Sequence, residues 1–271
     1  EALLKISRKL GPPHYIDIDP FGSPAPFVFS AVYTIRNGGV VALTATDLAV
    51  LEGKYSSKLF RRYGVKSRGK FPSKDIAIRN LISFVVRTAS IFDKAAEPVL
   101  VHGGRHYVRV YIRIRSGANR ANMVLNRCIG SIAICSFCGF VAMGKSVQEI
   151  GSSCPKCGHL LFLFENTWTC DMVDPDIVLK LRSRVTNMAW LSSSSKELLL
   201  KAVSIHSSSL FPYRIALIAR YLKTNIPPLS KLIECVEASG YKAFRGYEHD
   251  EVYSNASYDD LADCVKRFST A

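Results

Sequence analysis

The 271-residue chain lacks the features that mark membrane and secreted proteins. It contains no uninterrupted run of about 18 apolar residues, which a membrane-spanning helix requires. Its first residues do not form a basic segment followed by an apolar one, as a secretion signal does. With 48% apolar residues the chain can still bury two or three compact cores. We therefore expect a soluble, cytoplasmic protein without a membrane partner.

Acidic residues are scarce in one part of the chain. Residues 54–127 contain 17 lysines and arginines against three acids, although the whole chain has 36 basic and 22 acidic residues. A local positive field attracts polyanions, and nucleic acid is the commonest of these in a cell. Residues 54–70 form a predicted basic loop whose cations could line up on RNA phosphates, or could simply be solvated. They are Lys54, Lys58, Arg61, Arg62, Lys66, Arg68 and Lys70.

A strand, a helix and a second strand are predicted near the start of the chain. Residues 15–19 and 40–44 are apolar and β-branched, and residues 23–36 carry apolar side chains at helical spacing. This order within about 30 residues is typical of a βαβ unit. Asp19 and Asp47 follow the two strands, at the sheet edge where open α/β sheets bind ligands. Asp47 is expected either to orient a substrate or to cap the following turn.

Residues 105–115 alternate between apolar and polar side chains, as a half-buried strand does. Arg105 and Arg109 lie on the polar face with tyrosines. We expect this face either to contact RNA or to cover an exposed sheet edge. Helices are predicted for residues 73–93 and 225–240, and the serines at 192–195 predict a short linker.

Two Cys-x-x-Cys pairs predict a metal site. Their spacing places four thiolates around one tetrahedral zinc ion. Because all four positions are cysteines, no coordination site is left open, and the zinc is expected to be structural. The predicted ligands are Cys135, Cys138, Cys154 and Cys157. The other four cysteines, Cys128, Cys170, Cys235 and Cys264, have no partner at such spacing and are expected to be buried thiols.

The stretch Asp-Pro-Phe-Gly, at residues 19–22, suits methylation of an exocyclic amine. The lone pair of such an amine is delocalised into its ring, so the nitrogen reacts poorly until acceptors hold its hydrogens. The Asp19 carboxylate and the Pro20 carbonyl are candidate acceptors, and Phe21 is a candidate for stacking on the base. The alternative is that Asp19 caps the next helix and Phe21 fills the core.

Four blocks together resemble the tRNA guanine-26 N2-dimethyltransferase family, in that family's order: DIDPFGSPAPF, TATDLAVLEG, RHYVRVYIRIR and PPLSKLIECVEASGYKAFRG. The resemblance implies transfer of one or two methyl groups from S-adenosylmethionine to the N2 amine of guanine 26 in tRNA. It implies that Asp19 and Phe21 are catalytic, with Phe21 stacking on the guanine. Pro20 is the further catalytic candidate from the motif, and Asp19 and Pro20 are also the expected cofactor contacts. The base would have to be flipped out of the folded RNA.

Two departures from the family pattern stand out. No G-x-G-x-x-G turn for the cofactor occurs in the sequence, so the chain resembles the C-terminal portion of the enzyme: a fragment, a split-gene subunit or a truncated form. A missing N-terminal half would then complete the cofactor site. The second departure is AFRGYE, where the family tends to have Ala-Ser-Arg-Thr-His; Arg245 matches and is a predicted RNA contact.

The expected fold is α/β, in three parts. Residues 1–127 would be the C-terminal part of a Rossmann-like methyltransferase domain, residues 128–170 a zinc-binding segment, and residues 171–271 a C-terminal α/β domain that binds tRNA. One alternative is a zinc-containing RNA-binding protein without activity of its own. Another is a methyltransferase acting on DNA adenine or a different base, which the later blocks disfavour.

Overall fold

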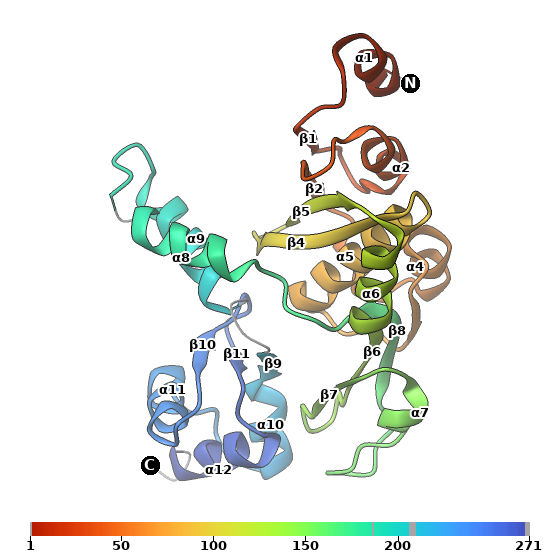
Figure 1. The fold of residues 1–271 in the computed structure, drawn as a ribbon. Coiled ribbons are helices and arrows are strands. Elements are labelled where there is room, and N and C mark those ends of the chain that lie inside the picture. Colours follow the sequence, from red (N-terminus) through yellow and green to blue (C-terminus); the bar gives the residue numbers. More distant parts are fainter. Residues whose placement is uncertain (1, 186, 206–209, 269–271) are drawn as a thin grey trace.

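The computed structural model describes residues 2–185, 187–205 and 210–268, so the predicted domain limits at 1 and 271 lie outside the described residues. The fold is mixed α/β, as expected, and the strands form three separate sheets. Helix α1 and helix α12 lie at opposite ends of the molecule (Figure 1). No helix in the described ranges is long and apolar enough to cross a membrane.

The first sheet carries the predicted βαβ unit. Strands β1 (Tyr15–Ile18) and β2 (Val40–Ala45) pair in parallel and are joined by α2 (Ala25–Thr34), which confirms the prediction. Strands β5 (Val108–Ser116) and β4 (Lys94–Gly103) follow in antiparallel orientation, giving the order β1-β2-β5-β4. Strand β1 is therefore an edge strand.

Strand β5 buries one of its two faces in the core. Its valines and isoleucines at 108, 110, 112 and 114 are fully buried, while the residues between them are only partly covered. The predicted alternation is thus confirmed, although the strand begins at Val108, and Arg105 lies in the preceding turn. The helices of this part are α1 (Ala2–Leu10), α3 (Leu48–Leu51), α4 (Ser56–Tyr63), α5 (Lys74–Ser90) and α6 (Ala118–Cys128).

The prediction of a loop over residues 54–70 was wrong. The segment contains α4 and the short strand β3 (Lys66–Arg68). Leu59 and Tyr63, four residues apart, are fully buried and hold the helix against the core, and Gly64 ends it in the left-handed conformation. The many charges hid this weak apolar spacing in the sequence.

The second sheet is antiparallel, in the order β3-β8-β6-β7, and carries the cysteine pairs. Its other elements are β6 (Ile129–Ile134), β7 (Val141–Gly144), α7 (Val147–Ile150) and β8 (Phe162–Trp168). Cys128 and Cys170 flank β6 and β8 and form a disulfide. The expectation of two free thiols was wrong here, because pairing of β6 with β8 brings together residues 42 positions apart.

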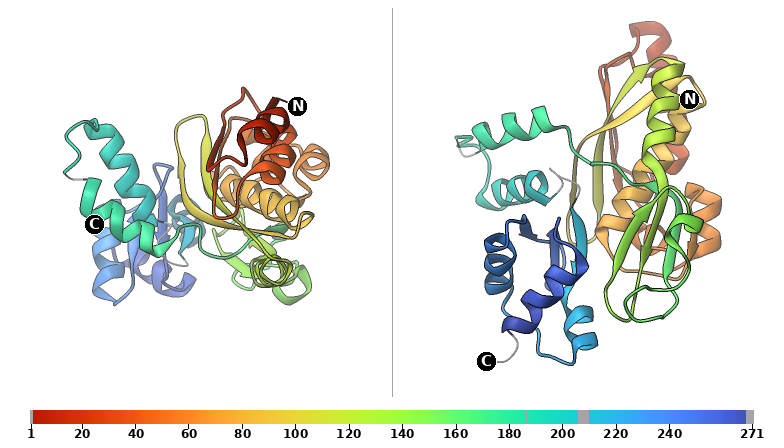
Figure 2. Two further views of the ribbon diagram at one scale, coloured as in Figure 1. Left: turned by 45° about the horizontal axis from the view of Figure 1, so that its top comes forward. Right: turned by 60° about the horizontal axis from the view of Figure 1, so that its bottom comes forward.

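The last part holds a helical arm and a small third sheet. Helices α8 (Pro175–Val185) and α9 (Ser193–Ile205) project to one side in all views (Figures 1 and 2). The serines at 192–195 start α9 instead of forming a linker, since the Ser192 hydroxyl accepts a hydrogen bond from the Ser195 amide. The sheet has the order β10-β11-β9.

We call residues 211–268 the C-terminal unit. It comprises β9 (Phe211–Arg214), α10 (Ile215–Leu222), α11 (Leu229–Ala238), β10 (Ala243–Arg245), β11 (Glu251–Ser254) and α12 (Tyr258–Phe268). Helix α11 confirms the helix predicted over residues 225–240. A disulfide joins Cys235 to Cys264, so the expectation of buried thiols was wrong for this pair too: α11 and α12 pack with the two side chains facing each other.

Candidate functional site

The Asp-Pro-Phe-Gly loop leaves the carboxyl end of β1 and is fastened to the end of β2. The Gly22 amide donates to the Thr46 hydroxyl at 2.8 Å, and the Thr46 amide donates to the Gly22 carbonyl at 2.9 Å. Gly22 has a φ of +89°, which glycine adopts without strain. The loop therefore has a fixed path at the carboxyl ends of β1 and β2, the edge at which open α/β sheets commonly bind ligands.

A buried tyrosine holds the next residue of the loop. The Ser23 hydroxyl lies 2.6 Å from the Tyr63 hydroxyl, which donates to the Asp47 carboxylate at 2.9 Å. Arg62 donates to the same carboxylate at 2.7 Å. Burial and the neighbouring Asp47 raise the pKa of Tyr63 well above its usual value, so the phenol stays protonated. Asp47 therefore anchors this network, and its carboxylate gives the adjoining helix no capping hydrogen bond.

The alternative roles considered for Asp19 and Phe21 do not fit the structure. Helix α2 begins after Pro24, so Asp19 does not cap it, and Asp19 itself is exposed. Phe21 is fully exposed and contributes nothing to the core. Asp19 and Pro20 line a pocket of about 500 Å³ together with Leu3, Ile16, Asp17, Ile18, Phe27 and Ser30.

Arg109 lies on the polar face of β5, but it already has protein partners. Its guanidinium donates to Asp17 at 2.6 Å, to Thr44 at 2.6 Å and to Tyr111 at 2.9 Å. Burial and the nearby Arg109 lower the pKa of His102 to about 4, so this histidine on the neighbouring strand is neutral. An RNA contact by Arg109 stays a prediction, and it would have to compete with the Asp17 ion pair.

The other predicted RNA-binding residues fall into two groups. Five exposed cations of α4, β3 and their flanks form what we call the α4–β3 surface: Lys54, Arg61, Lys66, Arg68 and Lys70. Lys58 on the same helix is partly covered, and Arg62 is paired with Asp47. Tyr55 and Phe60, both 51% exposed, lie among these cations. Clustered cations with exposed rings are suited to phosphates and unpaired bases.

Arg105 and Arg245 form the second group, beside helix α9. Arg105 lines a pocket of about 480 Å³ with Lys74 and Lys201, and Arg245 lines another of about 620 Å³ with Lys196 and Lys201. Glu197 and Lys201 line both pockets, so tertiary packing brings the two predicted residues next to the same helix. The sequence did not predict a role for Lys196 and Lys201 of α9, because they are isolated cations next to Glu197 and three leucines and form no basic run.

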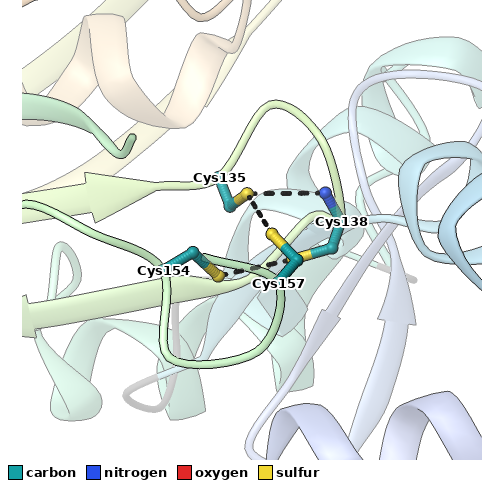
Figure 3. A group of neighbouring side chains, drawn as sticks. All are labelled: Cys135, Cys138, Cys154 and Cys157. Carbon is teal, nitrogen blue, oxygen red and sulfur yellow. Dashed lines mark hydrogen bonds between the residues drawn. The ribbon is translucent and has the colours of Figure 1, made fainter. Parts of the chain in front are cut away.

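The four predicted metal ligands come together as expected (Figure 3). Their sulfur atoms all lie within 4.8 Å of one another, with Cys135 Sγ 3.4 Å from Cys157 Sγ and Cys138 Sγ 3.5 Å from Cys154 Sγ. A tetrahedral zinc site with Zn–S bonds of about 2.3 Å has sulfurs about 3.8 Å apart. Burial and the neighbouring thiols raise the pKa of Cys138, so a cation is needed to hold four thiolates together. The donor set fits a structural zinc ion.

A buried acidic cluster joins α5 to the C-terminal unit and was not predicted. Burial, followed by the charge of Asp75, raises the pKa of Glu251 to about 7. Its carboxylate accepts a hydrogen bond from the Tyr247 amide at 2.8 Å. Lys74 pairs with Glu248 at 2.6 Å in the same region. The sequence could not predict this cluster, because the residues that meet in it come from segments more than 170 positions apart.

The fold is that of an α/β protein with an exposed Asp-Pro-Phe-Gly loop at the carboxyl ends of two parallel strands and a four-cysteine cluster in a different sheet. A model of one family matches residues 2–266, and its description is N2,N2-dimethylguanosine tRNA methyltransferase. The chain belongs to this family, which confirms the resemblance found in the sequence.

Relatives with curated names agree with the family. The chain is 32% identical over 261 residues to the tRNA (guanine(26)-N(2))-dimethyltransferase of Metallosphaera sedula, covering 93% of this chain and 65% of that protein. The enzyme of the same name from Methanopyrus kandleri is 34% identical over 246 residues, covering 90% of this chain and 62% of that one. The chain therefore spans slightly less than two thirds of the length of these relatives.

A solved structure shares the fold. It is described as a complex of Trm1 from Pyrococcus horikoshii with S-adenosyl-L-methionine. The TM-score is 0.76 at 23% sequence identity, over 93% of this chain and 66% of that one. At this identity the likeness supports the fold of the present chain.

Proposed function

We propose that this chain provides the substrate-binding and catalytic loop of a tRNA (guanine-26-N2)-dimethyltransferase dependent on S-adenosylmethionine. The observation that carries the proposal is the exposed Asp19-Pro20-Phe21 sequence, fixed by Thr46 and Tyr63 at the carboxyl ends of the parallel strands β1 and β2. A rigid loop with a free carboxylate and a free ring fits a base drawn out of the RNA. Family membership supports the same substrate.

In the proposed reaction, the Asp19 carboxylate and the Pro20 carbonyl accept the hydrogens of the guanine N2 amine. This holds the nitrogen lone pair toward the incoming methyl group, while the exposed Phe21 ring stacks on the base. S-adenosylmethionine, when bound, supplies an electrophilic methyl group on a sulfonium. Catalysis then rests mainly on positioning, without a covalent intermediate on the protein.

The pocket beside Asp19 and Pro20 fits the methyl-donating end of the cofactor. We propose that the remaining cofactor contacts come from a partner segment outside this sequence, the missing N-terminal half expected above. The exposed edge of β1, the absence of a G-x-G-x-x-G turn, and the coverage of 65% of the Metallosphaera protein support this. The cofactor site of this chain alone would then be incomplete.

The proposed division of the chain follows the three sheets except at strand β3. Residues 1–127 carry the partial Rossmann-like methyltransferase domain, and residues 128–170 carry the zinc site held by Cys135, Cys138, Cys154 and Cys157. Residues 171–271 would help to hold the tRNA, together with the α4–β3 surface. Strand β3 belongs to the first domain by sequence but pairs with β8, so the zinc segment shares a sheet with it. A cytoplasmic location stays a prediction.

The proposal is tested by methyl transfer from labelled S-adenosylmethionine to an unmodified tRNA transcript, followed by nucleoside mass spectrometry. The chain alone is compared with a version extended upstream to a start methionine, each as wild type and as Asp19→Asn. We expect methylated guanosine from the extended wild type and at least a hundredfold less from its Asp19→Asn variant, with tRNA affinity unchanged. Equal product from both variants would make Asp19 a bystander.

A second candidate is an RNA-binding module without activity of its own. The α4–β3 surface and the four-cysteine site favour it, because neither depends on the cofactor. It predicts salt-sensitive tRNA binding by both forms and no methylated guanosine from either. The same experiment therefore separates the two functions.

A further inference from the structure

Each cysteine pair is contacted by a tyrosine from the C-terminal unit. Tyr258, the first residue of α12, donates its hydroxyl to the Cys138 carbonyl at 2.9 Å. Tyr221 of α10 donates its hydroxyl to the Lys156 carbonyl at 2.8 Å. The first acceptor lies in the Cys135–Cys138 pair and the second in the Cys154–Cys157 pair. The C-terminal unit is thus attached to the backbone of both halves of the metal site.

Helix α10 adds further contacts to the first pair. Arg220 donates to the carbonyls of Ser136 and Phe137 at 2.8 and 3.1 Å, and its guanidinium lies 5.7 Å from the Phe137 ring centre. Gly139 packs so closely on α10 that an added Cβ would lie 3.1 Å from Ile218. Through these contacts, the turn at residues 135–139 packs directly against helix α10 of the C-terminal unit.

The acceptors are backbone carbonyls, and this detail links the interface to the metal. A carbonyl can be placed only by the path of its own backbone. In a Cys-x-x-Cys turn this path is fixed when both thiolates bind the same ion, and it relaxes when the ion leaves. The Tyr221 and Tyr258 hydroxyls therefore meet well-placed acceptors only while the four sulfurs are held together.

A second attachment of the C-terminal unit, which includes the buried acidic cluster on α5, does not involve cysteine. Lys74 of α5 pairs with Glu248 at 2.6 Å, and Arg214 donates to the Pro72 carbonyl at 3.3 Å. If the contacts at the metal site were lost, the unit could pivot about this attachment. Arg245, which lies in the same unit, would then change its position relative to Asp19.

We propose that the four-cysteine site positions the C-terminal unit, with Tyr221, Tyr258 and Arg220 transmitting the state of the metal site to the orientation of that unit. Metal binding would then control RNA binding without any contact between metal and RNA. The effect on RNA rests on the proposed function, whereas the effect on orientation does not.

The test measures orientation first. The zinc content of the purified chain is determined by mass spectrometry, and small-angle X-ray scattering and limited proteolysis are compared before and after removal of the metal by a chelator. Circular dichroism checks that the helices remain. We expect one zinc per chain, and after chelation a larger radius of gyration and at least tenfold faster cleavage near the C-terminal unit.

A double variant, Tyr221→Phe with Tyr258→Phe, removes the two hydroxyls and keeps every cysteine. It should retain zinc and still shift the docked-to-undocked equilibrium about tenfold or more toward the undocked form, as expected for loss of two hydrogen bonds. The matched control is Tyr241→Phe, which removes a hydroxyl bonded to Asp260 at 2.8 Å within the same unit. The control should behave like the wild type.

The outcomes separate the two proposals. Scattering and proteolysis that are unchanged by both chelation and the double variant would overturn the positioning role, as would a chain that binds no zinc. If orientation changes but even the zinc-loaded wild type does not bind tRNA, the positioning role stands and the proposed function fails. If both hold, chelation and the double variant should each weaken tRNA binding at least threefold, and Tyr241→Phe should not.

Discussion

Replacing Phe21 by alanine should separate catalysis from stability more cleanly than any other change in the loop. Phe21 is fully exposed, so removal of its ring uncovers no core surface and leaves no cavity. Exposed substitutions usually change the free energy of unfolding by no more than about 0.5 kcal/mol. Removing a buried phenylalanine costs about 3–5 kcal/mol. Phe164, which is fully buried, supplies the matched comparison.

The functional loss should be much larger than the loss of stability. Stacking of one base on an aromatic ring is worth about 1–3 kcal/mol. At about 1.4 kcal/mol per factor of ten, Phe21→Ala should weaken tRNA binding or slow methyl transfer about fivefold to 150-fold. Phe164→Ala should instead lower the free energy of unfolding by about 3–5 kcal/mol.

The assays are urea unfolding followed by circular dichroism, tRNA binding, and single-turnover methylation by the form that proves active. A transcript without a base at position 26 provides a second control. If Phe21 stacks on that base, Phe21→Ala should have little effect on binding of the baseless transcript. The stacking role would be refuted if both transcripts lost affinity equally, or if Phe21→Ala unfolded as readily as Phe164→Ala.

Three further predictions follow from the described contacts. Tyr63→Phe removes the hydroxyl that contacts both Ser23 and Asp47, and we expect a loss of about 1–3 kcal/mol in the free energy of unfolding. In the form that proves active, the methylation rate should fall at unchanged tRNA affinity. An unchanged rate would contradict the role of Tyr63 in fixing the loop. Replacing Lys54, Arg61 and Lys66 together by alanine should reduce the slope of log affinity for tRNA against log salt by about 2–3 if each contacts a phosphate, while an unchanged slope would remove the α4–β3 surface from the RNA site. Glu251 keeps a proton in the folded state up to about pH 7, whereas its ordinary pKa is 4.5, so its contribution to stability falls as the pH rises between these values. Glu251→Gln should flatten part of that decline in urea unfolding measured across the window, and Glu52, whose pKa burial also raises to about 7, should account for another part.

Much of the candidate site was predictable because its signals are local. The Cys-x-x-Cys spacing, the alternation along β5 and the strand–helix–strand order around Asp19 depend on neighbouring residues, and the structure confirms each of them. Residues 54–70 were predicted to be a loop because charged residues dominate their composition. Only Leu59 and Tyr63, four positions apart, show the apolar spacing of helix α4.

The sequence by itself determined which residues of the alternating strand face the core, the spacing of the cysteine pairs and the motif Asp-Pro-Phe-Gly. These are properties of short stretches of chain. Only the tertiary structure decided that Cys128 pairs with Cys170 and Cys235 with Cys264, since composition and spacing do not say which side chains meet. It also decided that Phe21 is exposed and that the Tyr258 hydroxyl meets a carbonyl 120 residues away. Such contacts depend on how sheets and helices pack, and packing is settled by the chain as a whole.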